Sequence, residues 1–190
     1  SKNKIYIPRY YGMDTYGDPD ELKLLKGDDI NIDFNGELRD YQNNIIDIFL
    51  KSAHKSKFGG GGLLEIPCGR GKTVIALIII SALKKKTLVI VHKSFLLNQW
   101  IERITQFLPT ARVGRIQGQI VDIENKDIVI GMLQSLSMKE YPTSVFESFG
   151  LTIIDEVHHI SSEVFSNSLF KLVTKYMLGL SATMNRKDGT

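Results

Sequence analysis

The chain has 190 residues, of which 43% are hydrophobic and 24% are charged, and its formal net charge is +3. These values predict one sizeable soluble domain with room for a small appendage, and the mild charge permits a polyanionic partner without requiring one. No apolar stretch is long enough to cross a bilayer, the first residues lack a signal-peptide core, and a single cysteine excludes an intramolecular disulfide. We therefore expect an intracellular protein, in the nucleus or the cytoplasm, without a membrane partner.

Taken in chain order, residues 1–36 show no clear hydrophobic period and are interpreted as an N-terminal extension. Helices are predicted at Leu38–Ala53, at Val74–Leu83, around Leu96–Leu108 and at Ser162–Val173. Strands are predicted at Leu63–Ile66, Thr87–Val91, Arg112–Ile116, Asp127–Ile130, Leu151–Ile154 and Met177–Leu180. This alternation predicts an α/β fold in which a mostly parallel central sheet carries helices on both faces.

Two of the predicted helices have a defined apolar face. In the first, helical spacing predicts burial of Tyr41, Ile45, Ile48 and Phe49. In the helix after the second strand, it predicts burial of Leu96, Trp100, Ile104 and Leu108. The glycine run at residues 59–62 is interpreted as a flexible connection into the first strand.

A phosphate-binding loop is predicted after the first strand, where residues 66–73 read I-P-C-G-R-G-K-T. The usual pattern, G-x-x-x-x-G-K-[ST], begins with glycine, and here Ile66 replaces it. Two later glycines still let backbone N–H groups approach phosphates, while Lys72 offers its charge to the β- and γ-phosphates and Thr73 its hydroxyl to Mg²⁺. An ordinary glycine-rich turn is the alternative. The residues assigned to ATP binding are Pro67, Cys68, Gly69, Arg70, Gly71, Lys72 and Thr73.

An acidic pair follows the apolar strand at Leu151–Ile154, at the edge where open α/β sheets carry their chemistry. Asp155 is assigned as a second ligand of Mg²⁺, through water. Glu156 is assigned to orient and deprotonate the attacking water, and His158 to link the nucleotide site to neighbouring segments. A solvated turn is the alternative for the pair. With Lys72, these two carboxylates predict a Mg²⁺-dependent nucleoside triphosphate hydrolase.

Three motifs in this order resemble the first RecA-like domain of superfamily 2 helicases over residues 37–190. They are the phosphate loop, D-E-V-H at residues 155–158, and S-A-T at residues 181–183. Just upstream, L-R-D-Y-Q at residues 38–42 resembles the segment that recognises adenine, which implies base contacts from Arg39 and Gln42. An exposed helix N-terminus is the alternative reading of that short segment.

Finer matches resemble a subgroup that contains XPB-like DNA helicases, helicases of large DNA viruses and UvsW-type phage helicases. They are P-C-G-x-G-K, D-E-V-H-H and G-L-S-A-T-M-N-R-K-D-G. Lys187 stands where the XPB group has the Glu of an Arg-Glu-Asp triplet, which puts a special unwinding role of that triplet in doubt. The Ile- and Lys-rich composition favours a viral or parasite source.

The resemblance also implies partners. Ser181 and Thr183, together with His158, would couple the ATP state to nucleic acid, and the contacts to a DNA backbone would come from His92, Lys93, Gln117 and Gln134. The DNA would be single-stranded or at a duplex junction. A second RecA-like domain of the full-length protein would complete the motor, and without it we expect this chain to hydrolyse ATP weakly.

Three alternatives remain at the level of function. The first is an RNA helicase, or a translocase subunit of a restriction or remodelling enzyme, since backbone contacts do not distinguish RNA from DNA. A catalytically idle nucleotide-binding scaffold is disfavoured by the intact Lys72, Thr73, Asp155 and Glu156. A kinase-like phosphotransferase would leave the matches at residues 38–42 and 181–183 unexplained.

Overall fold

The computed structural model describes residues 5, 7–21, 24, 26–157 and 172–182. Its helices are α1 (Arg9–Tyr16), α2 (Asp40–Ala53), α3 (Lys72–Leu83), α4 (Ser94–Phe107) and α5 (Leu133–Met138), with a 3₁₀ turn η1 (Thr143–Val145). Its strands are β1 (Gly61–Glu65), β2 (Thr87–Val91), β3 (Val113–Gln117), β4 (Ile120–Asp122), β5 (Ile128–Met132), β6 (Leu151–Asp155) and β7 (Tyr176–Ser181).

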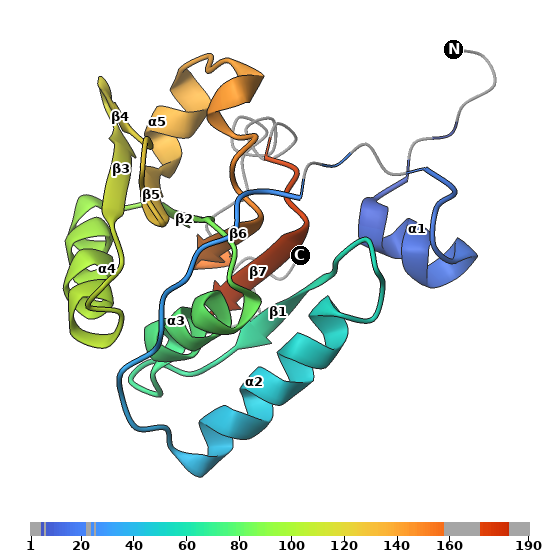
Figure 1. The fold of residues 1–190 in the computed structure, drawn as a ribbon, viewed down its shortest axis with the longest axis horizontal. Coiled ribbons are helices and arrows are strands. Elements are labelled where there is room, and N and C mark those ends of the chain that lie inside the picture. Colours follow the sequence, from blue (N-terminus) through green and yellow to red (C-terminus); the bar gives the residue numbers. More distant parts are fainter. Residues whose placement is uncertain (1–4, 6, 22–23, 25, 158–171, 183–190) are drawn as a thin grey trace, which may run out of the picture.

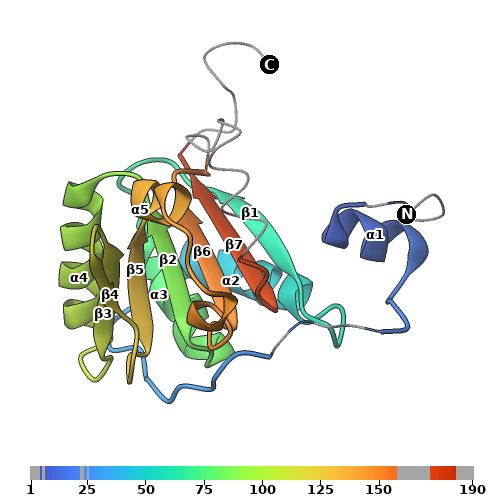
Figure 2. The same cartoon turned by 90° about the horizontal axis from the view of Figure 1, so that it is seen from above.

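The described strands form one sheet in the order β1-β7-β6-β2-β5-β3-β4 (Figure 2). Every neighbouring pair is parallel except β3 and β4, which pair in the antiparallel sense. The central strands β2, β5 and β6 are buried along their whole length, as their continuous apolar sequences predict. The parallel arrangement brings the carboxyl ends of β1, β2, β5, β6 and β7 to one edge of the sheet, where the site lies.

Helices cover both faces of the sheet, which confirms the predicted layers (Figures 1 and 2). On one face α2, α3 and α4 pack beside one another and form a core with Val89 and Val91 of β2. On the other face α5 and the segment around η1 pack against Leu88 and Ile90 of the same strand. The alternation of faces along β2 explains why residues 88–91 of this strand are all apolar.

The predicted strands agree with the observed ones to within two residues, but the short elements were missed. The prediction did not include α1, α5 or β4, and β4 is exposed at all three of its positions. In α2 the buried positions are Gln42, Ile46, Phe49 and Ala53. The predicted burial of Ile48 is wrong, since its side chain is 59% exposed. Residues 162–171 of the last predicted helix lie outside the described residues.

The glycine run at residues 59–62 is tightly packed, so its interpretation as a flexible connection is wrong. Gly59 has φ of +96°, and a Cβ there would lie 2.2 Å from the carbonyl oxygen of Lys175. At Gly61 a Cβ would lie 2.4 Å from the carbonyl oxygen of Met177. The run therefore lets the start of β1 approach the backbone around β7 more closely than any side chain allows.

We expect Gly61→Ala to lower the free energy of unfolding by about 1–3 kcal/mol, because the new methyl group must displace backbone. Gly62→Ala is the matched control, since a Cβ at Gly62 meets only the Phe49 ring at 3.4 Å, an ordinary contact. Urea denaturation of both variants measures the two effects. Equal losses of stability would contradict close packing at Gly61.

The segment before residue 37 contributes to the core. Ile30 and Ile32 are 8% and 2% exposed and pack with the residues of α3. The backbone N–H of Ile30 donates to the carbonyl of Lys84 at 3.0 Å, and the Ser81 hydroxyl donates to the carbonyl of Ile32 at 3.0 Å. The division of the chain at residue 37 stays a prediction, and these contacts tie residues 28–32 to the sheet-and-helix body.

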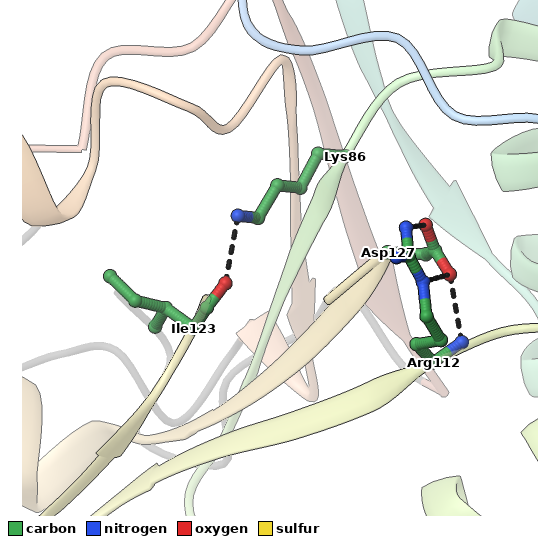
Figure 3. Close-up of polar contacts among 4 residues, drawn as sticks. All are labelled: Lys86, Arg112, Ile123 and Asp127. Atoms are coloured by element: carbon green, nitrogen blue, oxygen red, sulfur yellow. Dashed lines mark hydrogen bonds and ion pairs between the residues drawn. The ribbon is translucent and has the colours of Figure 1, made fainter. Parts of the chain in front are cut away.

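Polar contacts join the amino-terminal ends of β3 and β5, and link the start of β2 to the end of β4, at the edge away from the site (Figure 3). The Arg112 guanidinium donates to both carboxylate oxygens of Asp127, at 3.0 and 2.8 Å. These bonds hold the pKa of Asp127 below its ordinary value despite partial burial. The buried Lys86 ammonium donates to the carbonyl of Ile123 at 2.9 Å.

Among the described residues, no helix has the length and apolar character needed to span a membrane.

Candidate nucleotide site

The predicted phosphate loop connects β1 to α3, as its sequence requires. Gly69 and Gly71 have φ of +76° and +80°, a conformation that side-chain-bearing residues rarely adopt. Ile66, which replaces the first glycine of the usual pattern, is buried, and its N–H donates to the carbonyl of Ser181 at 2.9 Å. The Ile66 side chain therefore anchors the entry of the loop in the core, a backbone hydrogen bond that any residue but proline could make ties it to β7, and the curled part of the loop keeps its glycines.

The start of α2 packs against this loop. The Tyr41 hydroxyl donates to the carbonyl of Arg70 at 2.9 Å. The Gln42 side chain is 5% exposed, and its oxygen accepts from the backbone N–H of Arg39 at 3.0 Å. A Cβ at Gly71 would lie 2.6 Å from the Gln42 amide nitrogen. The structure thus places Arg39 and Gln42 beside the loop, and their contacts with adenine stay a prediction.

Lys72 and Glu156, which are 84 positions apart in the chain, form an ion pair in the structure. Lys72 is the first residue of α3, and Glu156 directly follows β6. Glu156 has φ of +54°, a left-handed turn. A continuing strand would send Asp155 and Glu156 to opposite faces of the sheet. The turn instead leaves both side chains lining one cleft with Lys72.

Asp155 is buried and has a partner that the sequence analysis did not foresee. Its Oδ2 accepts from the indole N–H of Trp100 in α4 at 2.9 Å. Burial raises the pKa of Asp155 above its ordinary value, the Trp100 hydrogen bond opposes that rise, the Glu156 charge adds to it and Lys72 opposes it. The two carboxylates thus have different environments: Glu156 faces a cation, and Asp155 a neutral donor.

The cleft between the loop, the end of β6 and α4 has a volume of about 400 Å³, within the usual range for small-molecule sites. The loop and the acidic pair contribute Cys68, Gly69, Gly71, Lys72, Thr73, Asp155 and Glu156. α4 adds Leu96, Gln99 and Arg103, which sequence analysis missed. Their spacing, three and four residues apart, places them on one side of the helix and is the signal that marks them.

Mg²⁺ fits the donors of this cleft. It prefers hard oxygen ligands and keeps several waters. The Thr73 hydroxyl and the Asp155 carboxylate line the same space as Lys72. The predicted pairing of the phosphate loop with the acidic pair around one site is therefore consistent with the geometry, and the individual ligand assignments stay predictions.

The residues expected to contact nucleic acid lie at the carboxyl ends of β2, β3 and β5. The Gln134 amide donates to the carbonyl of His92 at 2.8 Å, which joins the ends of β5 and β2. Lys93 lies 5.9 Å from the centre of the exposed Phe95 ring, and Gln117 ends β3. The structure gathers these side chains along one edge of the sheet, outside the nucleotide cleft.

The three residues expected to couple the two sites are only partly described. Ser181 ends β7, is fully buried, and accepts from the Ile66 N–H through its carbonyl. His158 and Thr183 lie outside the described residues. The coupling role of all three stays a prediction.

Comparison with known proteins gives the family. Residues 35–186 match the family model described as type III restriction enzyme, res subunit. A protein of Acanthamoeba polyphaga mimivirus, named as an ATP-dependent RNA helicase, is 41% identical over 98% of this chain and 36% of its own length. The DNA 3'-5' translocase XPB2 of Sulfurisphaera tokodaii is 36% identical over 80% of this chain and 32% of its own. This chain thus spans about a third of the length of these relatives.

Solved structures with low sequence identity share the fold. The SWI2/SNF2 ATPase core of Sulfolobus solfataricus in complex with dsDNA has a TM-score of 0.66 at 24% identity, over 86% of this chain and 36% of that one. The UvsW helicase of bacteriophage T4 has a TM-score of 0.61 at 19% identity, over 84% of this chain and 58% of that one. By its family match and its RecA-like sheet, this chain belongs to the type III restriction enzyme res subunit family of superfamily 2 helicase domains.

Proposed function

We propose that this chain is the ATP-binding domain of a DNA helicase or translocase, in which hydrolysis of Mg²⁺–ATP drives movement on DNA or its unwinding. The observation that carries the proposal is the contact between Lys72 and Glu156 in a cleft that Thr73 and Asp155 also line. The proposal assigns Lys72 as the phosphate-binding cation, Thr73 and Asp155 as oxygen ligands of a metal and Glu156 as the base, and their shared cleft supports these assignments. Phosphoryl transfer needs little more from the protein than positioning and charge stabilisation.

Each group has one task in the proposed reaction. Backbone N–H groups of the loop and the Lys72 ammonium hold the phosphates, and the amino end of α3 favours their negative charge. The Thr73 hydroxyl and, through water, the Asp155 carboxylate would hold Mg²⁺, which would supply positive charge to offset that of the phosphates. Glu156 then orients a water toward the γ-phosphorus and accepts its proton. Because Glu156 pairs with Lys72 in the structure, nucleotide binding has to separate that pair before the carboxylate is available as a base.

A DNA partner is favoured by the finer motifs of the sequence and by what two similar proteins are named for. The archaeal relative is named as a DNA translocase, and the structural neighbour with the higher TM-score was solved with dsDNA. RNA is the second candidate, because the viral relative with 41% identity is named as an RNA helicase. The edge formed by the ends of β2, β3 and β5 offers a lysine, amides and backbone N–H groups, which suit phosphates of either polymer.

A second RecA-like domain in the full-length protein completes the proposed motor by closing over the nucleotide with an arginine finger. Removal of such an arginine lowers turnover by about 10³–10⁵. We therefore propose that the 190-residue chain alone binds ATP and hydrolyses it slowly. The location that we propose for the protein is intracellular, in the nucleus or the cytoplasm. The relatives from large DNA viruses support a viral protein acting in an infected cell.

The test compares ATP hydrolysis by the full-length protein in the presence of DNA and RNA strands of matched sequence and length. We expect DNA to stimulate hydrolysis more strongly than RNA. The 190-residue chain should show little stimulation by either strand. Stimulation by RNA alone would replace the DNA assignment, and rapid strand-stimulated hydrolysis by the isolated chain would contradict the need for a second domain.

A further inference from the structure

Trp100 is the sole tryptophan of the chain and lies fully inside the protein, with 1% of its side chain exposed. Its indole N–H donates to Oδ2 of Asp155 at 2.9 Å, and both groups are buried. The contact joins α4 to the end of β6, two elements that both line the cleft. None of the motifs used to assign the nucleotide site includes this residue.

We propose that Trp100 is a positioning residue for the metal-binding carboxylate of the site. Its N–H fixes one oxygen of Asp155 and leaves the other to a water bound to Mg²⁺. The inference rests on the proposed function, because it assigns Trp100 a role toward the same metal. Groups that hydrogen-bond to a metal ligand do not touch the metal, yet their loss typically weakens metal binding by about 10–100-fold.

The chemistry of the donor suits this task. An indole N–H donates but does not accept, and it neither gains nor loses a proton near neutral pH. A lysine or arginine at the same place would compete with Mg²⁺ for the carboxylate charge, whereas a neutral donor leaves that charge to the metal. Two cations line the cleft: Lys72 pairs with Glu156, and Arg103 donates to the Gln106 side chain at 2.9 Å.

Packing fixes the position of the donor. Leu97 and Ile104, one turn before and one turn after Trp100 on α4, are 2% and 0% exposed and belong to the same core. The indole therefore cannot follow the Asp155 side chain if that side chain turns away. The cleft-lining residues Gln99 and Arg103 flank Trp100 on the same helix, so α4 holds the orienting group and one wall of the cleft as one rigid unit.

A purely structural explanation is that the hydrogen bond only satisfies a buried indole. The two explanations differ in what the N–H does for Mg²⁺. We therefore propose to replace Trp100 by β-(3-benzothienyl)alanine, which keeps the ring shape and puts sulfur in place of N–H, and by Phe. The matched packing control is Ile104→Val, which removes one methylene from the same buried helix face without touching Asp155.

Binding of a fluorescent non-hydrolysable ATP analogue is measured in EDTA and during titration with Mg²⁺. We expect both Trp100 variants to bind the analogue in EDTA as the parent chain does, and to need about 10-fold more Mg²⁺ for its metal-dependent tightening. Mn²⁺ binding to the nucleotide complex, followed by electron paramagnetic resonance, should weaken in parallel. Ile104→Val should keep the parent Mg²⁺ affinity, and thermal denaturation reports the folding of every variant.

An unchanged Mg²⁺ requirement in the benzothienyl variant would overturn the positioning role and leave Trp100 as a packing residue. An equal weakening of binding in EDTA would also overturn it, because the effect would then not be specific to the metal. If the parent chain shows no Mg²⁺-dependent tightening at all, the proposed function itself fails. These results separate the failure of the inference from the failure of the function on which it rests.

Discussion

Replacing Glu156 with Gln should lower the rate of ATP hydrolysis by about 10²–10⁴ and leave nucleotide binding intact. The amide has the shape of the carboxylate, but it cannot accept a proton from the attacking water. It also lacks the charge that holds Lys72 in the ion pair of the nucleotide-free site. Since Lys72 no longer has to leave a carboxylate before it meets the phosphates, we expect affinity for ATP at least equal to that of the parent protein.

Single-turnover hydrolysis and equilibrium binding of a fluorescent ATP analogue measure the two effects separately in the full-length protein. Glu102→Gln is the control, because Glu102 is an exposed acid on α4 outside the cleft. Parent-like hydrolysis in Glu156→Gln would remove Glu156 from the role of base. A large loss of binding would instead show that its carboxylate supports the nucleotide, against the assignment made above.

Replacing Lys72 with Ala should weaken ATP binding by about 10²–10³-fold. Removal of one partner from a buried, hydrogen-bonded charge pair, here Lys72 with the phosphates, costs about 2–5 kcal/mol of binding free energy, and each 1.4 kcal/mol is a factor of ten in affinity. The side chains of Lys72 and Glu156 are 12% and 20% exposed, so water screens the Glu156 charge only in part. In Lys72→Ala that uncompensated carboxylate would face the incoming triphosphate and repel it.

The double variant Lys72→Ala with Glu156→Gln tests this explanation. It should bind ATP more tightly than Lys72→Ala alone, because the repelling carboxylate is gone. Isothermal titration calorimetry of the parent, the two single variants and the double variant gives a double-mutant cycle for ATP binding. Lys51→Ala, at an exposed position of α2 away from the loop, serves as the charge-matched control. A double variant no better than Lys72→Ala would show that repulsion from Glu156 contributes nothing to the loss.

The elements that the sequence predicted best are those whose burial the local pattern already determines. β2 was predicted with its observed bounds, since Thr87 and the four apolar residues that follow it fit a fully buried strand of that length. The phosphate loop and the acidic pair were found because binding phosphates and a metal ion requires glycine, lysine and carboxylate at those positions. Their convergence followed from parallel strands that end at one edge of the sheet.

The failures come from interactions that connect distant parts of the chain. Helical spacing in α2 allowed two neighbouring faces, and packing against α3 and β1 buried Ile46 rather than Ile48. Trp100 was predicted as a core residue, but a periodic pattern does not show which group meets the indole N–H. The glycines at residues 59–62 resemble a linker in composition, and only the backbone of β7 and the end of α2 explain them.

The contacts of residues 28–32 set a practical limit on where this domain can be cut. The N–H of Asp28 donates to the carbonyl of Ser148 at 2.8 Å, and the carbonyl of Asp28 accepts from the N–H of Lys86 at 2.9 Å. A recombinant fragment that starts at residue 37, where the helicase resemblance begins, would lose these bonds and uncover the hollow filled by Ile30 and Ile32. An autonomous version of the domain therefore has to begin at or before Asp28.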